Sequence, residues 1–141
     1  MFLNITGQIL GDYATTAAMD TFTASKNDRH PTDLAKLRGP RIVTASETEH
    51  GHAWAEARIK ALTGGDVISA RFMRQDFFEY KPQFKLTVIG NHKPVIRNVD
   101  DAMRRRINII PFVYKPAVVD RELESKLIIE APGILQWMIE G

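Results

Sequence analysis

The chain has 141 residues, of which 44% are hydrophobic and 26% are charged, and its net charge at pH 7 is +2. This composition can supply the core of one folded domain, and it excludes a disordered tail. The absence of cysteine excludes a disulfide framework and any zinc site built on thiolates.

No apolar run approaches the roughly 20 residues that a membrane-spanning helix needs. The first residues also lack the basic region and long apolar stretch of a signal peptide. We therefore expect no membrane partner and a cytoplasmic location, which the lack of cysteine permits. Because the overall basicity is mild, nucleic-acid binding would require local positive charge, and basic residues do gather in residues 71–85 and 93–106. The alternative for each of them is an ordinary solvated surface charge.

The first quarter of the chain predicts a helix followed by a loop. Residues 2–9 have apolar side chains at helical spacing, and the pattern stops at Gly11. Because this helix begins without a cap, we expect that a segment upstream has been removed. Residues 15–33 are rich in Thr, Ser, Asn and Asp, which predicts a loop, with a short helix at residues 31–37.

The middle of the chain alternates between strands and helices. Residues 41–46 predict a short strand of apolar and β-branched residues, and residues 53–62 predict a helix that ends at Gly64 and Gly65. Residues 67–72 and 77–80 predict the two arms of a hairpin, with its turn near residues 73–76. Residues 85–90 predict a second buried strand.

The last third predicts one more strand and three helices. A short helix at residues 100–105 precedes a third strand at residues 107–112. Asp120 is predicted to cap the next helix, and Pro132 to open a last helix that extends to Gly141. Strands that alternate with helices predict an α/β fold with a mainly parallel sheet, in one domain over residues 1–141.

Aromatic residues allow two interpretations. Phe77, Phe78 and Tyr80 can stack on the bases of single-stranded nucleic acid. Their alternation can instead bury one face of the hairpin, and the pattern favours this second interpretation. Trp54 and Trp137 lie on apolar faces of predicted helices, which predicts core positions.

Acidic residues follow the first predicted strand. Glu47 and Glu49 stand after its carboxyl end, the place where α/β sheets bind ligands. Carboxylates there can polarise water or hold Mg²⁺ near phosphates. The alternative is a strand that simply leaves the sheet into a polar loop.

Two further features belong to the same chemistry. Asn91 follows the second strand, where an amide can orient an attacking water or contact a γ-phosphate, although asparagine is common at strand ends. Residues 104–106 are three successive arginines, and a fixed guanidinium can neutralise charge on a transferring phosphoryl group. An arginine triplet alone more often marks a solvated helix end or a nucleic-acid patch.

In this order, the segments resemble the superfamily 3 AAA+ helicases, and among them the C-terminal motor of phage, plasmid and poxvirus-type primase–helicases. Residues 39–49 resemble the Walker B strand, residues 59–71 the segment that leads into a DNA-contacting hairpin, residues 86–94 motif C with its sensor Asn91, and residues 100–112 the arginine-finger segment. Residues 133–137 with Gly141 resemble the closing helix. The most specific part is residues 60–71.

The resemblance implies an AAA+-like, P-loop NTPase fold, a three-layer sandwich with a β-hairpin insertion. The Gly-Lys-Ser/Thr phosphate loop of that fold is absent from the sequence, so we expect the domain to be incomplete at its N-terminus. The implied cofactors are ATP and Mg²⁺. Related motors often carry two adjacent acids at the end of this strand, and here Ser46 takes the place of the first. Glu47 is therefore expected to activate water, while its contact with Mg²⁺ is less firmly implied. Glu49 is the second choice for either role.

The resemblance also implies roles for residues elsewhere in the chain. The implied catalytic residues are Glu47, Glu49, Asn91, Arg105 and Arg106, with Ser46 and Lys60 at the nucleotide, and Arg71, Arg74 and Lys81 at DNA. The implied partners are single-stranded DNA and further copies of the chain in a homo-oligomeric ring, expected as a hexamer. The expected function is part of an ATP-dependent DNA helicase motor of a phage or plasmid-type primase, with the isolated chain inactive. The alternative is a non-catalytic remnant or scaffold domain that keeps the fold without turnover.

Overall fold

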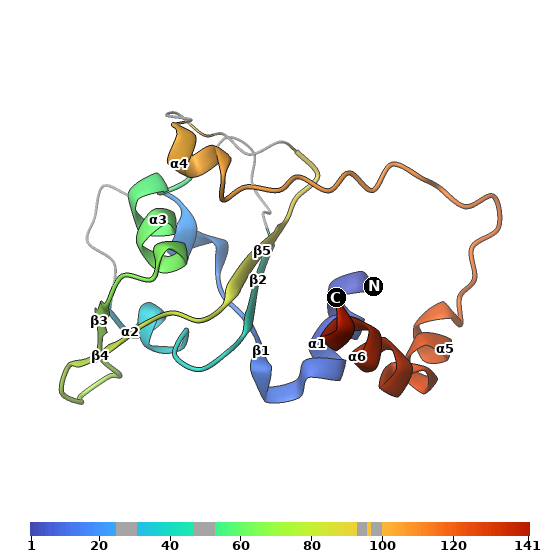
Figure 1. Ribbon diagram of the computed structural model, residues 1–141, viewed down its shortest axis with the longest axis horizontal. Helices are drawn as coiled ribbons and strands as arrows, with labels where there is room; N and C mark the ends of the chain where they lie inside the picture. The colour runs from blue at the N-terminus through green and yellow to red at the C-terminus, as the bar shows by residue number, and fades with distance from the viewer. Residues whose placement is uncertain (25–30, 47–52, 93–95, 97–99) are drawn as a thin grey trace. The chain divides into compact units, whose positions relative to one another are not determined.

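A computed structural model describes residues 1–24, 31–46, 53–92, 96 and 100–141 (Figure 1). The chain divides into two compact units, residues 12–108 and residues 1–11 with 109–141. In the described part of the chain, none of the helices has the length and apolar character needed to cross a membrane.

The larger unit is built on a parallel sheet of three strands. These strands are β1 (Ala14–Thr16), β2 (Ile42–Ser46) and β5 (Lys85–Ile89), in the order β1-β2-β5. The α/β fold with a parallel sheet is therefore confirmed, as are the two strands predicted from apolar runs. β1 falls partly in a segment predicted to be loop, because its short polar sequence becomes a strand only by pairing with β2.

Helices of the larger unit are short. They are η2 (Met19–Phe22), α2 (Pro31–Ala35), α3 (Glu56–Gly64) and α4 (Asp101–Arg104), and the 3-10 helix η1 (Gly11–Tyr13) precedes β1. Gly65 ends α3 with a φ of 86°, a left-handed conformation that glycine adopts without steric cost. The predicted helix end at Gly64 and Gly65 is thus confirmed.

One face of the sheet contributes to a continuous hydrophobic core. Val43 and Ala45 of β2 are fully buried, and they alternate with the half-buried Ile42 and Thr44. The buried residues of this core are Phe22, Leu37, Val43, Ala45, Ile59, Leu62, Phe84 and Met103. The sheet, α3 and α4 are therefore held together by apolar burial, the main favourable contribution to folding.

The predicted hairpin is present, with shorter arms than expected. Strands β3 (Ile68–Ala70) and β4 (Phe78–Tyr80) pair antiparallel, with Ala70 opposite Phe78. Residues 71–77 form the loop that projects from these strands in Figure 1.

The smaller unit contains three helices, all of them predicted. They are α1 (Phe2–Leu10), α5 (Leu123–Ile129) and α6 (Ala131–Glu140); α1 contacts α5, and α5 contacts α6. This unit, all of which is described, buries only Ile5 and Thr6. The core position predicted for Trp137 is therefore wrong, because its side chain is 69% exposed.

Asp120 stabilises the start of α5 without being its N-cap residue, which is Glu122. Asp120 Oδ1 accepts a hydrogen bond from the Glu122 backbone N–H at 2.9 Å, and Lys126 Nζ donates to Asp120 Oδ2 at 2.7 Å. Both bonds favour the charged carboxylate, and they lower the pKa of Asp120, with the Lys126 contact as the larger cause.

The third strand predicted at residues 107–112 is wrong. These residues form neither helix nor strand, and Ile109, Ile110 and Phe112 are largely exposed. A β-strand requires a neighbour for its backbone N–H and C=O groups. No strand in the described residues pairs with this segment, so its apolar and β-branched sequence alone does not make it a strand.

Candidate functional site

The parallel register brings two predicted site residues to one edge of the sheet. Ser46, the last residue of β2, pairs with Ile89, the last residue of β5, and Asn91 follows two residues later. Both Ser46 and Asn91 are exposed, at the carboxyl ends of parallel strands where α/β folds bind ligands. Glu47 and Glu49 lie outside the described residues.

Two threonines on the neighbouring strands β1 and β2 escaped sequence analysis. The hydroxyls of Thr16 and Thr44 lie 3.1 Å apart on neighbouring strands, and the Thr44 hydroxyl donates to the Thr15 carbonyl at 3.4 Å. Thr16 could not be recognised because its segment was predicted as loop. These hydroxyls add polar groups to the sheet face that includes Ser46.

Lys60 lies in an ion pair between α3 and α4. Its Nζ donates to Asp100 Oδ2, while Asp100 Oδ1 accepts the Met103 backbone N–H at 2.9 Å and so caps α4. The hydrogen bond from Lys60 is the largest of the causes that lower the pKa of Asp100. Met103 is fully buried, so the start of α4 is fixed by its core contact and by its cap. The nucleotide-binding role predicted for Lys60 remains a prediction.

Arg105 and Arg106 are exposed directly after α4. Arg105 Nε donates to the Asp101 carbonyl at 3.2 Å, and Arg106 Nη1 donates to the Ala102 carbonyl at 2.8 Å. A Cβ atom added to Gly64 would lie 3.3 Å from Arg106 Nη2, so the glycine leaves room for this guanidinium at the C-terminus of α3. Cations are favoured at helix C-termini, where carbonyl groups lack partners.

Three predicted DNA-contacting residues belong to the hairpin. The Arg71 guanidinium lies over the ring of Phe77, 4.8 Å from its centroid. Arg74 has a φ of 60°, in a turn in which the Gln75 N–H donates to the Phe72 carbonyl at 3.2 Å. Lys81 is exposed directly after β4.

Aromatic rings form the base of the hairpin. Phe72 stacks on Phe78 at 5.6 Å between centroids, and Phe78 lies 6.0 Å from Tyr80. The Tyr80 hydroxyl donates to the Leu34 carbonyl at 2.6 Å, and burial raises the pKa of Tyr80 from 10.0 to about 12. Arg38 lies over the Phe78 ring at 5.0 Å, a contact that sequence analysis missed because the two residues are far apart in the chain.

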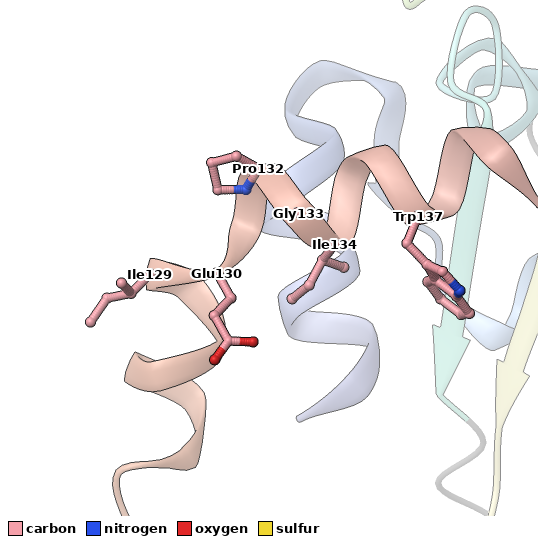
Figure 2. A pocket seen from close by; sticks show the side chains of 6 residues that line it. All are labelled: Ile129, Glu130, Pro132, Gly133, Ile134 and Trp137. Carbon is pink, nitrogen blue, oxygen red and sulfur yellow. The ribbon is translucent and has the colours of Figure 1, made fainter.

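A cavity of about 480 Å³ lies where α5 meets α6. It is lined by Ile129, Glu130, Pro132, Gly133, Ile134 and Trp137, and Figure 2 shows Ile134 and Trp137 on the same side of α6. None of the predicted site residues lines this cavity. Within the described ranges, no three acidic or histidine side chains gather where they could hold a metal ion.

A parallel sheet with polar residues at its carboxyl edge and an inserted hairpin is consistent with a P-loop-like sandwich. This α/β class contains many activities, so the fold alone does not define the function. The chain belongs to a family of unknown function (DUF5906), whose pattern matches residues 1–106.

Several viral proteins are similar to the chain. The chain is 35% identical over 83 residues to "Putative helicase L207/L206" of Acanthamoeba polyphaga mimivirus, a match that covers 59% of this chain and 9% of the relative. It is 31% identical over 112 residues to "Putative helicase 022R" of Frog virus 3 (isolate Goorha), covering 74% and 11%. It is 38% identical over 95 residues to "Putative helicase 184R" of Invertebrate iridescent virus 6, covering 63% and 10%. The chain thus spans about a tenth of the length of these relatives.

Proposed function

We propose that this chain is a segment of an ATP-dependent DNA helicase motor of the superfamily 3, primase-associated type. Two independent considerations support the proposal. The relatives carry helicase names, and the segments of this chain follow the order of the motifs of such a motor. In this proposal the chain works as part of a longer protein that couples ATP hydrolysis to movement along DNA.

The observation that carries the proposal is the pairing of Ser46 with Ile89. This pairing brings the carboxyl ends of β2 and β5 to the same edge of the sheet, with Asn91 two residues after β5. We propose that the acid that follows Ser46 in sequence and the Asn91 amide act on one bound phosphate at this edge. In the proposed roles, Glu47 accepts the proton of the attacking water, and the Asn91 amide orients that water.

The side chains described at this edge fit part of a Mg²⁺–phosphate site. The Ser46 hydroxyl and the Asn91 amide carry oxygens that can bind Mg²⁺ or accept from its waters, and their O–H and N–H groups can donate to phosphate oxygens. Glu47 directly follows Ser46 in sequence and would hold the metal ion with it. Bound Mg²⁺ supplies charge that offsets the negative charge of the phosphates.

Arg105 or Arg106 is proposed to complete the site of a neighbouring copy in a ring. Both are exposed, and the buried Met103 anchors the helix that carries them. A guanidinium supplied in this way neutralises charge on the transferring phosphoryl group. The hairpin residues Arg71, Arg74 and Lys81 are proposed to contact the phosphate backbone of single-stranded DNA, without reading its sequence.

The test uses the full-length protein that carries this segment. We expect Glu47→Gln to keep ATP binding and to abolish ATP hydrolysis and DNA unwinding, because the amide cannot accept a proton from water. Binding is measured by equilibrium titration with a fluorescent ATP analogue, and turnover by phosphate release. If Glu49→Gln has this effect and Glu47→Gln does not, the catalytic acid is Glu49. A wild-type protein that binds no ATP and hydrolyses none would contradict the proposal as a whole.

A further inference from the structure

The aromatic residues of the hairpin divide into two groups with different surroundings. Phe78 and Tyr80 are half-buried, and they contact each other and residues outside the hairpin. Phe77, which directly precedes β4, is 59% exposed. Phe78 and Tyr80 thus stabilise the hairpin base, as the alternation predicted, and Phe77 has no comparable role in packing.

The Arg71 guanidinium lies over the ring of Phe77. At 4.8 Å from the ring centroid, it forms a cation–π pair with an exposed aromatic ring. Although Arg71 lies over the ring, Phe77 remains largely exposed to solvent. The pair therefore presents a flat, apolar ring beside a positive charge.

Charge alone does not make this hairpin a strong ligand for phosphates. Residues 68–80 contain two cations, Arg71 and Arg74, and two anions, Asp76 and Glu79. With the exposed Lys81 that directly follows β4, the net charge of this hairpin is only +1. So small a net charge attracts phosphates only weakly, and a second kind of contact would add to the affinity.

We propose that Phe77, held by Arg71, is a stacking site for a base of single-stranded DNA. Every base has a flat π-face, so stacking on Phe77 adds affinity without selecting a sequence. Bases of a duplex are already stacked within it, so the site favours single strands over duplex DNA. This inference rests on the proposed function, and it identifies which form of DNA the hairpin binds and by which contact.

The test measures binding of the 141-residue chain to a fluorescein-labelled oligothymidylate of about 12 nucleotides, by fluorescence anisotropy. A second oligonucleotide has the same number of phosphates, with abasic sites in place of the bases. We expect the abasic strand to bind at least about fivefold more weakly, since stacking of one base is worth about a fivefold to a hundredfold change in affinity. Phe77→Ala should weaken binding of the thymidylate strand by a similar factor and leave binding of the abasic strand unchanged.

Tyr13→Ala is the matched control, because Tyr13 is an equally exposed aromatic residue, at 58%, outside the hairpin. It should leave both affinities unchanged, and circular dichroism should show that both variants keep the fold. Phe77→Trp should retain thymidylate affinity, and the emission of the new tryptophan should be quenched by thymidylate and not by the abasic strand.

Equal binding of the two strands, with no effect of Phe77→Ala, would overturn the stacking site and leave phosphate contact as the mode of binding. An effect of Phe77→Ala on the sedimentation coefficient of the chain and none on DNA affinity would assign Phe77 to a protein interface instead. A chain that binds neither strand at low salt would overturn the DNA contact proposed for the hairpin, and the stacking site with it.

Discussion

Lys60 of α3 and Asp100 at the start of α4 form an ion pair, and the same Asp100 carboxylate caps α4 through the Met103 N–H. One carboxylate therefore joins two helices and sets the first turn of the helix that precedes Arg105 and Arg106. Gly64, four residues further along α3, leaves room for the Arg106 guanidinium, so α3 lies beside this arginine segment at two points.

We expect the ion pair between Lys60 and Asp100 to make the free energy of unfolding depend on pH. The pKa of Asp100 is lowered in the folded chain, so its charged form is favoured by folding. The stability that it contributes is present above the ordinary pKa of 3.8 and is lost as pH falls through the lower, folded value. We expect the difference in free energy of unfolding between the wild type and Asp100→Asn to be constant near pH 6 and to disappear in strong acid. Urea unfolding across this pH range measures it, and in a Lys60→Met background the difference near pH 6 should be smaller.

The arginines after α4 predict complementation between subunits of the full-length protein. Arg105→Ala or Arg106→Ala should lower ATP turnover by about 10³-fold and leave nucleotide binding largely intact, because the guanidinium acts on the charge of the transition state. Mixing the inactive arginine variant with Glu47→Gln subunits should restore phosphate release, since each subunit supplies the group that the other lacks. Arg104→Ala is the control and should retain activity. Failure to restore activity at any mixing ratio would mean that each site is complete within one chain.

Substitutions of Arg74 can separate the effect of backbone strain on stability from the effect of its charge on DNA binding. A left-handed conformation costs a residue with a side chain about 1 kcal/mol or more, and glycine avoids this cost. We expect Arg74→Gly to be more stable than Arg74→Ala by about 1 kcal/mol in urea unfolding. Both variants should weaken single-stranded DNA binding equally and lower the slope of log K against log salt by about one unit. Arg121→Ala, an exposed arginine outside the hairpin, should change neither quantity; an unchanged salt slope in both Arg74 variants would remove Arg74 from the DNA contact.

We expect the free energy of unfolding to fall at alkaline pH because of Tyr80. Its hydroxyl donates to the Leu34 carbonyl, so Tyr80→Phe should lower the free energy of unfolding by about 1 kcal/mol. Because burial raises the pKa of Tyr80 from 10.0 to about 12, the neutral phenol is favoured in the fold, and the wild type should lose stability as pH rises from 10.0 toward 12. Tyr80→Phe should lack that part of the alkaline loss. Urea unfolding of both chains checks this, with the exposed Tyr13→Phe as the control.

Sequence alone predicted those elements that carry their own local signal. The strands β2 and β5 have apolar, β-branched sequences, and α1 and α6 have apolar residues at helical spacing. The strand β1 and the false strand at residues 107–112 show the limit of such signals. In both cases the outcome depends on whether a partner strand is present, and that information lies elsewhere in the chain.

The candidate site was predictable to a similar degree. Asn91 could be located from the end of an apolar strand, although β5 is only half-buried and not buried as predicted, and the hairpin arginines could be located from the pattern of its arms. The pair between Lys60 and Asp100 and the contact of Arg38 with Phe78 join residues that are 40 positions apart in the chain. No local pattern indicates which distant charge or ring a side chain will meet, so these contacts required the structure.

The order of the sheet strands has a consequence for how the chain folds during its synthesis. Thr16 meets Thr44, which lies 28 residues away, and Ile42 pairs with Lys85, which is further still. Helix α3 and the β3–β4 hairpin involve only neighbouring residues, and such local elements form in microseconds, whereas pairing of distant strands must first close long loops. On the ribosome, α3 and the hairpin can fold while the nascent chain is still growing. The edge formed by Ser46 and Asn91 can assemble only after β5 has emerged from the exit tunnel.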